Sequence, residues 1–588
     1  MAAGTSTALV VQTKDGTTVG GAAPRIPSDR EMQIVAERIR EFGQYQIWRN
    51  VYAGQCEEVA ELILPTSRNT FFYQNFNWPG AKKTQQQVDA TGALALHRFC
   101  AIADSLVTPR NDYWHGLEGD EYVMKDRASR LWCEQTAADL FRLRYAAAAN
   151  FAAQNYNNWQ SLGAFGNATM YVDRFDGRWD HGQRGLRYKA VPFGETFFGE
   201  NHQGKVDRII RWFKLTAYQA VQKWGREWLP QNLVAPLEAD SQWPYNFLHC
   251  VSPRGEDYDP EALDARSLPF VSHYISLEGR CLMQPESGYR VFPYAVRRYD
   301  QAPNECYGRG PAQLVLPALK TLNAEKVTFL KQGHRAADPV LLLADDGIVG
   351  MDMRPGAQNK GGVTQDGKPL VHTLPTGDIQ ISKEMMGEER AIIDDVFLVS
   401  LFKVLTEHPN MTATQVVELV NEKGMLVAPT LGRQFSEYVG GMVPRELQLM
   451  SEMGLVRPMP PRLREAVAAL GLAAIGVTDT SPLAKAAKAG RAAGFMRAVE
   501  NSREIVAITQ NPEYLDPYDF DTATKDIARI GGVPESWMAD EQAIALKRKQ
   551  RADMQAQQAR IQALPAQAAM VKAQAALAQK APQAGGPV

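Results

Sequence analysis

The sequence has few cysteines, and those it has form no recognisable metal or disulfide pattern. Six of the 588 residues are cysteine, with no CxxC pair and no zinc-ligand spacing among them. We expect no secretory signal, and therefore free, buried thiols in a reducing cytosol. The cysteines are widely scattered, at Cys56, Cys100, Cys133, Cys250, Cys281 and Cys306.

The chain also lacks a long apolar run and a strong net charge. Its longest apolar segment, residues 466–477, covers about 12 residues, whereas a membrane-spanning helix needs about 20. Lys and Arg number 64 and Asp and Glu number 66, so the formal charge is 64 − 66 = −2. We therefore expect no membrane partner. The missing basic excess does not exclude DNA, because a surface past which DNA slides should avoid a dense lining of lysine.

Motifs for nucleotide binding and catalysis are missing as well. The sequence contains no GxxxxGK[ST], GxSxG or HExxH motif. A Gly-Arg-Gly segment at 308–310 begins like a dinucleotide-binding loop, but Gln313 stands where the third glycine should be. The absence of a Walker motif and of an acidic metal cluster argues against a packaging motor or a nuclease.

Two clusters of potentially reactive residues favour structural interpretations. Asp516, Asp519 and Asp521 lack the spacing of a calcium-binding EF-hand, and caps of successive short helices explain them better. His249 and Cys250 have no further metal ligands nearby in sequence, which is typical of core or edge packing. We therefore predict a structural protein, with no enzyme activity, no cofactor and no metal site.

The first three hundred residues have an α+β pattern. After a Gly- and Ser-rich arm over residues 1–29, helical periodicity predicts helices over 30–64, 86–106 and 126–155. Thr216 is expected to cap a further helix. Five segments with a period near two predict strands, at 169–172, 186–191, 208–215, 271–275 and 288–293.

The most informative segment follows, from Tyr307 to Leu343. A helix begins at Pro311, where the missing N–H costs nothing, and Pro317 should bend it. Short strands are predicted over 340–343 and 370–374, and a second long helix over 379–405. One helix thus leaves a body, a small β unit lies at its end, and another helix returns.

The remainder is predicted to be mainly helical. A capping box at 412–415 should start a helix that runs to about Met453, with kinks at Pro429 and Pro444. Short helices joined by turns are expected over 462–545. Beyond residue 545 the Ala- and Gln-rich sequence is typical of either a solvated helix or a disordered tail.

The order of these elements resembles one family, the portal proteins or head-to-tail connectors of short-tailed phages (podoviruses), over about residues 30–545. The resemblance rests on the order and spacing of several short segments together with the helix that follows Tyr307. These segments are LILP at 62–65, LVTP at 106–109 followed by YW at 113–114, GAFGNATMYV at 163–172, LTAYQ at 215–219 and SPLAK at 481–485.

The resemblance implies an α+β, mainly helical portal fold in a ring of typically twelve copies at one capsid vertex, with double-stranded DNA passing non-specifically through it. It implies virion localisation, host cytoplasm during assembly, and packaging and ejection of the genome. The partners implied are other copies of the chain, the terminase large subunit, tail and adaptor proteins, and capsid and scaffolding proteins. The domains implied are a wing over 30–307 and 412–455, stem helices over 308–337 and 379–405, a clip over 338–378, a tunnel loop over 406–411, a crown over 456–545 and a tail or barrel helix over 546–588.

Charges on the two stem helices bear on the subunit contacts. The first helix carries four cations and one anion, a net of 4 − 1 = +3, and the second carries three cations and five anions, a net of 3 − 5 = −2. Opposite signs suit packing between neighbouring copies, and ordinary solvated faces explain them equally well. The expected subunit contacts are Lys320, Lys326, Lys331, Arg335, Glu388, Glu389, Asp394 and Asp395.

Two further sets of residues follow from the resemblance. The expected DNA-channel residues are Lys403, Thr406, Glu407, His408 and Asn410. The expected docking residues of the clip are Asp345, Asp346, Arg354, Lys360 and Lys368. The main alternative is another virion component, a capsid or tail-tube subunit, although such a protein gains nothing from a helix that leaves the body and returns.

Overall fold

The computed structural model has an α+β fold in two compact units. The first contains residues 1–117, 136–458 and 477–494, and the second contains 118–135, 459–476 and 495–588. The structure describes residues 11–12, 18–19, 27–72, 84, 87–175, 184–255, 257–343, 351–375, 379–400 and 431–578.

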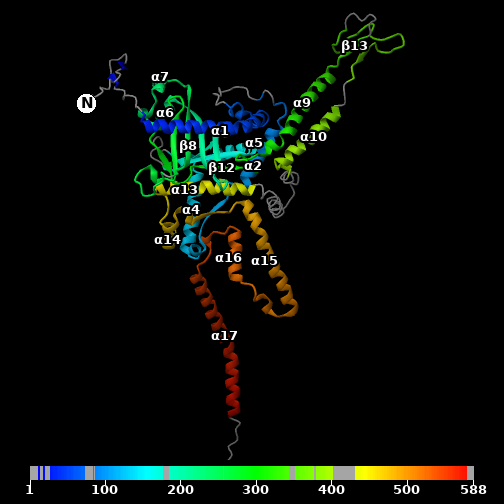
Figure 1. The fold of residues 1–588 in the computed structure, drawn as a ribbon. Helices are drawn as coiled ribbons and strands as arrows, with labels where there is room; N and C mark the ends of the chain where they lie inside the picture. The colour runs from blue at the N-terminus through cyan, green and yellow to red at the C-terminus, as the bar shows by residue number, and fades with distance from the viewer. Residues whose placement is uncertain are drawn as a thin grey trace, which may run out of the picture. The chain divides into compact units, whose positions relative to one another are not determined.

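Helices contribute more residues to the first unit than strands do (Figure 1). The α-helices are α1 (Asp29–Leu62), α2 (Thr91–Val107), α5 (Phe151–Phe165), α6 (Ala217–Trp224), α7 (Val234–Glu238), α8 (Pro311–Leu314), α9 (Leu316–Ala337), α10 (Ile379–Val396) and α13 (Gly440–Glu452). Short 3₁₀ turns are η1 (Pro65–Ser67), η2 (Ala147–Ala149), η3 (Phe193–Glu195), η4 (Arg226–Trp228), η5 (Gln231–Leu233) and η6 (Ala265–Ser267). α4 (Arg127–Arg144), α15 (Pro482–Thr509), β3 (His115–Gly119) and β15 (Ile475–Asp479) have residues in both units.

Two antiparallel sheets lie beside these helices. The larger has the order β10-β9-β8-β7-β6 with β11 also on β9, and the smaller has the order β12-β4-β5. The strands of the larger sheet are β6 (Thr196–Glu200), β7 (Val206–Thr216), β8 (Pro244–Pro253), β9 (Phe270–Ser276), β10 (Cys281–Leu282) and β11 (Ser287–Tyr289). Those of the smaller are β4 (Asn167–Arg174), β5 (Leu186–Val191) and β12 (Tyr294–Arg298), and β1 (Val11–Gln12) pairs with β2 (Thr18–Val19).

Helix α1 covers one face of the larger sheet. Ser28 and Glu31 form a capping box, with Ser28 Oγ accepting from the Glu31 N–H at 3.3 Å, so the helix begins as the sequence requires. Further along, the buried Arg49 donates to the backbone carbonyls of Thr196 and Phe71, both at 2.8 Å. Leu248 and Cys250 are two residues apart on β8 and point to the same face, as the two-residue period of a strand requires. The core between the helix and this face contains Val35, Phe42 and Tyr45 of α1 and Phe197, Ile210, Leu248, Cys250, Ile275 and Leu282 of the strands.

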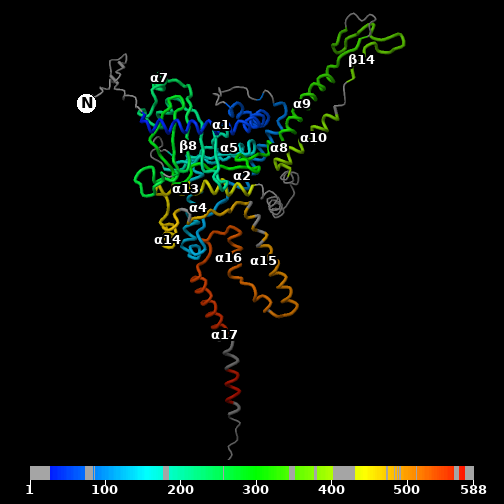
Figure 2. The backbone as a smooth tube through the Cα atoms, in the orientation of Figure 1, coloured from blue at the N-terminus to red at the C-terminus, as the bar shows by residue number. Residues whose placement is uncertain are grey.

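A second and larger core joins α1, α2, α5 and the smaller sheet to two protruding helices, α9 and α10. Leu319 and Leu322 of α9 are buried in this core, and so are Met386 and Ile393 of α10. Past them the two helices run side by side away from the body and end at β13 (Leu341–Leu343) and β14 (Val371–Thr373), as Figure 2 shows. We call α8, α9, β13, β14 and α10 the stalk. Twenty-two residues in α9 make a rod of about 33 Å.

The predicted elements of the stalk are confirmed. Pro311 is the first residue of α8, and the helix is interrupted at Val315, before Pro317. The two short strands form an antiparallel pair in which Leu342 lies opposite His372. Helix α10 starts at Ile379 as predicted but ends at Val396, because a turn in which Leu398 has a left-handed φ of 61° interrupts the helix predicted to reach residue 405. Residues 401–405 lie outside the described residues.

The single helix predicted over 126–155 is wrong. The chain forms α4, the turn η2 and α5 instead, and Asn150 has a left-handed backbone with φ of 57°. Alanine residues at 146–149 favour a helix by propensity, but packing overrides propensity here. Because of the turn, the rings of Tyr145 and Phe151 pack edge to face at 5.3 Å, whereas residues six positions apart on one helix point to different sides.

Strand β8 was not predicted, although it lies in the middle of the larger sheet. Residues 247–251 are buried on both faces, so the strand lacks the alternation that marks a half-exposed strand. His249 accordingly belongs to the core, as predicted. Its Nδ1 lies 2.6 Å from the Tyr294 hydroxyl and its Nε2 lies 3.0 Å from Ser272 Oγ, and burial lowers the pKa of His249 well below its ordinary value.

Two of the predicted caps, Thr216 and Asp519, are confirmed, one in each unit, whereas the capping box predicted at 412–415 lies outside the described residues. Thr216 forms a capping box with Gln219 at the start of α6, and Asp519 Oδ1 accepts from the N–H groups of Asp521 and Thr522 at the start of α16. The second unit contains α3 (Glu121–Met124), α14 (Pro461–Leu470), η8 (Gly471–Ala474), η9 (Pro512–Leu515), α16 (Phe520–Ile530), η10 (Glu535–Trp537) and α17 (Glu541–Ala578). The tail beyond residue 545 is thus helical as far as Ala578.

A buried ion pair holds α13 inside the first unit. The chain before α13 has a π-helical stretch, Phe435–Val439, and Pro444 lies inside α13, where a kink was predicted. Arg144 of α4 forms a two-point pair with Glu446, at 2.5 and 3.0 Å, and both side chains are fully buried. The Tyr188 hydroxyl of β5 also donates to Glu446, so one carboxylate joins α4, β5 and α13.

Replacing Glu446 should destabilise the fold strongly, because a fully buried charge on Arg144 would lose its partner. We expect Glu446→Gln to cost about 3–5 kcal/mol of unfolding free energy, measured by chemical denaturation. The control is Arg457→Gln, which removes a half-exposed pair with Asp139 at 2.5 Å and should cost about 0–1 kcal/mol. Equal costs for the two variants would contradict this account of the core.

Candidate functional site at the stalk and its root

Three glycines form the root of the stalk. Gly308 and Gly310, just before α8, lie directly against Gly166 at the end of α5. A Cβ atom on Gly166 would come within 2.3 Å of Gly310 N and 2.6 Å of the Gly308 carbonyl oxygen. Gly166 also has a left-handed φ of 68°, which other residues rarely adopt. The glycines at 308–310 therefore permit close approach of two backbones, and the nucleotide-loop interpretation of this segment is not needed.

Asn167 and Tyr52 satisfy the backbone groups of this contact. Asn167 Oδ1 accepts from Gly308 N at 2.8 Å, and Asn167 Nδ2 donates to the Gly308 carbonyl oxygen at 2.8 Å. The Tyr52 hydroxyl of α1 lies against the same carbonyl. Asn167 Nδ2 also donates to this hydroxyl, at 3.1 Å. Burial raises the pKa of Tyr52 well above its ordinary value, which keeps the hydroxyl neutral. We call Tyr52, Gly166, Asn167, Gly308 and Gly310 the glycine clasp.

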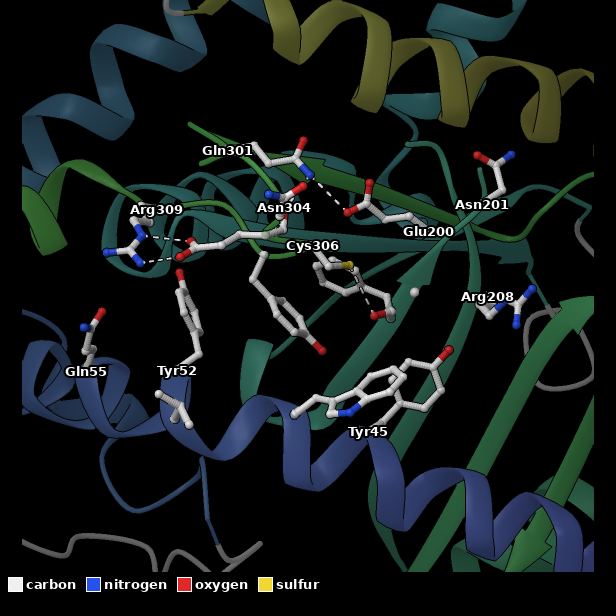
Figure 3. Close-up of a pocket in the computed structure, with 16 residues that line it drawn as sticks. Tyr45, Tyr52, Gln55, Glu200, Asn201, Arg208, Gln301, Asn304, Cys306 and Arg309 are labelled. Atoms are coloured by element: carbon white, nitrogen blue, oxygen red, sulfur yellow. Dashed lines mark hydrogen bonds and ion pairs between the residues drawn. The ribbon is translucent and has the colours of Figure 1, made fainter. Parts of the chain in front are cut away.

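A cleft of about 780 Å³ opens beside the clasp. Figure 3 shows Tyr45, Tyr52 and Gln55 of α1 on one side and the segment from Gln301 to Arg309 on the other. Its polar groups are paired with one another: Arg309 with Glu305 at 2.6 Å, and Gln301 Nε2 with Glu200 at 3.0 Å.

The cleft does not have the chemistry of an active site. Burial raises the pKa of its one thiol, Cys306, from 9.0 to about 12, so the nucleophilic thiolate is not formed near neutral pH. Among the residues that the structure describes, no group of His, Cys, Asp or Glu is placed to hold a metal ion. A search of the same residues finds no helix that is long and apolar enough to cross a membrane.

The predicted basic residues of α9 are not equivalent. Lys320 forms an ion pair at 2.6 Å with Glu58 of the same chain. Lys326 lies half-buried, with its Nζ 5.5 Å from the centre of the Phe329 ring. Lys331 and Arg335 are exposed and form no ion pair within the described part of the chain.

Three carboxylates gather where α9 faces α10. Burial and then the charges of Glu389 and Glu388 raise the pKa of Glu325. Glu325 Oε2 is buried and accepts no hydrogen bond. Asp394 and Asp395 lie further along α10, half-buried and exposed respectively. The sequence predicted that α10 is acidic, but not that an acid of α9 faces its acids.

The tip of the stalk is exposed. Arg354 pairs only with the neighbouring Asp352, at 3.0 Å, and Lys360 and Lys368 are exposed to solvent. Two apolar side chains of β13, Leu342 and Leu343, are about half exposed, at 48% and 53%. Asp345 and Asp346 lie outside the described residues, as do all five predicted channel residues, Lys403, Thr406, Glu407, His408 and Asn410.

The glycine clasp yields a test of how the stalk is anchored. We expect Gly166→Ala to destabilise the chain, because the left-handed backbone alone costs of order 1–3 kcal/mol and the added Cβ meets backbone atoms. The matched control is Gly333→Ala in α9, where nothing lies within 4 Å and alanine should stabilise the helix by about 0.5–1 kcal/mol. Thermal and chemical denaturation measure both, and a neutral Gly166→Ala would contradict the close contact.

Comparison with known proteins adds independent evidence. The family described as "Bacteriophage head to tail connecting protein" matches residues 38–538. A "Probable portal protein" of Bordetella phage BPP-1 is 26% identical, over 88% of this chain and 91% of that protein. The "Portal protein" of Salmonella phage epsilon15 is 23% identical, over 89% of this chain and 92% of that protein.

Among solved structures, a chain from the neck of an empty gene transfer agent (GTA) particle aligns with this chain at 13% identity. The alignment covers 65% of this chain and 90% of the GTA chain. Its TM-score is 0.31, which is too low to establish a shared fold. The family match and the two portal proteins each span most of the chain. The chain therefore belongs to the bacteriophage head-to-tail connecting protein family, the portal proteins, whose members are structural and not enzymes.

Proposed function

We propose that copies of this chain form a closed ring at one capsid vertex and that the genome is packaged and ejected through the centre of this ring. The observation that supports this proposal best is the stalk itself. Its root is buried in the main core, whereas apolar side chains along its length and at its tip are left exposed. A monomer gains nothing from such a surface, but neighbouring copies or other virion proteins could cover it.

The register between α9 and α10 defines which residues share a level. Ser382 Oγ donates to Gln332 Oε1 at 3.4 Å, and Glu325 lies near Glu389. The two pairs are seven residues apart on α9, 332 − 325 = 7, and seven apart in the opposite direction on α10, 389 − 382 = 7, as antiparallel helices require. Lys326 is therefore level with Glu388, and Lys320 with Asp394.

Rotation about a ring axis keeps each residue at its own height when the stalks run nearly parallel to that axis. Lys326 of one copy can then meet Glu388 and Glu389 of the next. Lys331 and Arg335 are level with residues 383 and 379 of α10, where the sequence has Lys383 and Ile379 and offers no acid. Of the basic residues predicted from charge, Lys326 is thus the best candidate for a subunit contact.

The exposed face of α10 supports the same contact. Ile381, Met385 and Ile392 are 49–57% exposed and lie on one helix face by their spacing of four and seven residues. Glu388 lies on this face as well, between Met385 and Ile392. An apolar stripe with an acid at its centre fits a neighbouring helix that offers apolar atoms and a cation, and α9 offers Leu330 beside Lys326.

The tip and the segment after α10 have separate proposed roles. Exposed Leu342, Leu343 and Arg354 suit docking of the terminase and, after packaging, of adaptor and tail proteins. Residues 403–410 follow α10 and are proposed to line the DNA channel, with Lys403 and His408 touching phosphates weakly. The wing, clip and crown boundaries given above belong to the same proposal.

Charge reversal of Lys326 should weaken the ring. We expect Lys326→Glu to shift copies from rings to monomers in native mass spectrometry, because the new carboxylate would face the like charges of Glu388 and Glu389. The matched controls Lys331→Glu and Arg335→Glu introduce the same charge change and should leave rings intact. Restoration of rings by Lys326→Glu together with Glu388→Lys would identify the pair. A stable monomer of the unaltered chain at high concentration would contradict the ring itself.

The raised pKa of Glu325 predicts a pH dependence of the stalk in the monomeric chain. A carboxyl with a raised pKa in the folded state stabilises that state at low pH, and this stabilisation is lost as the pH rises from the ordinary value, 4.5, through the raised value. Hydrogen exchange of residues 316–337 and 379–396 should therefore speed up as the pH rises above 4.5, beyond the change in intrinsic exchange rate. Glu325→Gln should abolish this pH dependence, whereas Glu384→Gln, at an exposed position of α10, should preserve it. An unchanged pH dependence in Glu325→Gln would contradict the cluster.

A further inference from the structure

The second unit contains a cleft of about 630 Å³ in which cations outnumber carboxylates. The cations are Lys125, Arg127, Arg130, Arg462, Lys525 and Arg529, and the carboxylates are Asp126, Glu535, Asp540 and Glu541. The lining therefore carries a formal charge of 6 − 4 = +2, although the whole chain carries −2. We call this cleft the basic cleft.

Several of these charges neutralise one another. Glu535 alone serves two arginines, with Arg130 Nε at 2.7 Å and Arg529 Nε at 3.8 Å. Lys525 pairs with Glu541 at 3.1 Å. These pairs fix the walls of the cleft, and by themselves they would be an ordinary structural network.

Two guanidinium groups are left without a carboxylate partner. Arg127 donates only to the backbone carbonyl of Met538, at 2.9 Å, and so retains most of its N–H groups. Arg462 lies 5.3 Å above the Tyr122 ring and forms no ion pair within the described residues. Asp126 interacts with Arg462 by charge, but its carboxylate accepts hydrogen bonds from the hydroxyl and the backbone N–H of Ser129. Paired guanidinium groups with free N–H donors are the usual protein ligands of phosphate.

The positive charge continues along α17. Ile544 lines the cleft, and Lys547, Arg548 and Arg551 lie three, four and seven residues beyond it, on the same face of the helix. Lys547 and Arg551 are exposed and form no ion pair among the described residues, whereas Arg548 pairs with Asp521. Seven residues of helix extend about 10 Å. The strip is therefore long enough for successive phosphates of a polymer.

We propose that the basic cleft and the basic strip of α17 bind the phosphate backbone of double-stranded DNA without reading its sequence. The choice of DNA as the polymer rests on the proposed function, in which the genome passes this chain. The residues of this site differ from the proposed channel residues 403–410, and all of them belong to the second unit.

The test measures binding of a short labelled duplex to the full-length protein by fluorescence anisotropy, between about 50 and 200 mM salt. We expect the double variant Arg127→Ala with Arg462→Ala to bind roughly tenfold more weakly. Its log–log salt slope should fall by about 1–2, because each lost phosphate contact removes about 0.9. The matched control is Arg464→Ala with Arg497→Ala, which removes two exposed arginines of the same unit outside the cleft and should leave affinity and slope unchanged.

A second pair of variants avoids any effect on folding. Lys547→Ala with Arg551→Ala changes only exposed residues of α17 and should also weaken binding severalfold. Unchanged affinity in both double variants would overturn the proposal. Binding that 10 mM inorganic phosphate abolishes, with no effect of the α17 variants, would instead indicate a site for one free phosphate and overturn the assignment to DNA. Ring formation by each variant, followed by native mass spectrometry, separates this outcome from failure of the proposed ring.

Discussion

The stalk depends on a contact between two pieces of backbone that only glycine allows. Gly166 ends α5 in a left-handed conformation, and Gly308 and Gly310 pass so close to it that no side chain fits between them. Asn167 then supplies both a donor and an acceptor to Gly308. Two chain segments about 140 residues apart are thus joined at one point, and the direction of α8 and α9 is set there.

The stalk is buried at its base and more exposed further out. Near the clasp, Leu319 and Leu322 pack into the main core and fix the base of α9. Further out, α9 and α10 bury less and keep three acids together, an arrangement that costs free energy in a single copy. A neighbouring cation would offset this cost. The least favourable part of the isolated stalk is therefore the part that a ring would complete, which agrees with the membership of the chain in the portal family.

Much of this architecture could be predicted from the sequence. Pro311 and Pro317 mark the start of the stalk, and the strands at its tip follow from short apolar runs between turn residues. Local signals also located the caps at Thr216 and Asp519. Such features depend on neighbours within four residues, which a sequence displays directly.

The rest depends on contacts between distant residues. Strand β8 carries no alternation because both faces are buried, and the turn at Asn150 is hidden by a run of alanine. The acids of α10 were recognised, but the sequence could not show that Glu325 faces them, nor that Lys320 is already paired with Glu58. The register of two antiparallel helices is fixed by their packing, so charge counts alone ranked the basic residues of α9 as equals.

The basic cleft differs in charge from the chain as a whole, and a DNA conduit has a use for both kinds of surface. A surface past which DNA must slide cannot hold many phosphates, because each neutralised phosphate adds affinity and slows movement. The near-neutral chain meets this constraint overall. A site that retains DNA needs the opposite, with several cations fixed in position and not consumed by carboxylates. The basic cleft and the strip along α17 have this character, since Glu535 is shared by two arginines, and Arg127 and Arg462 form no ion pair within the described residues. A chain with a charge of −2 can therefore still hold DNA at one place while it lets DNA pass at another.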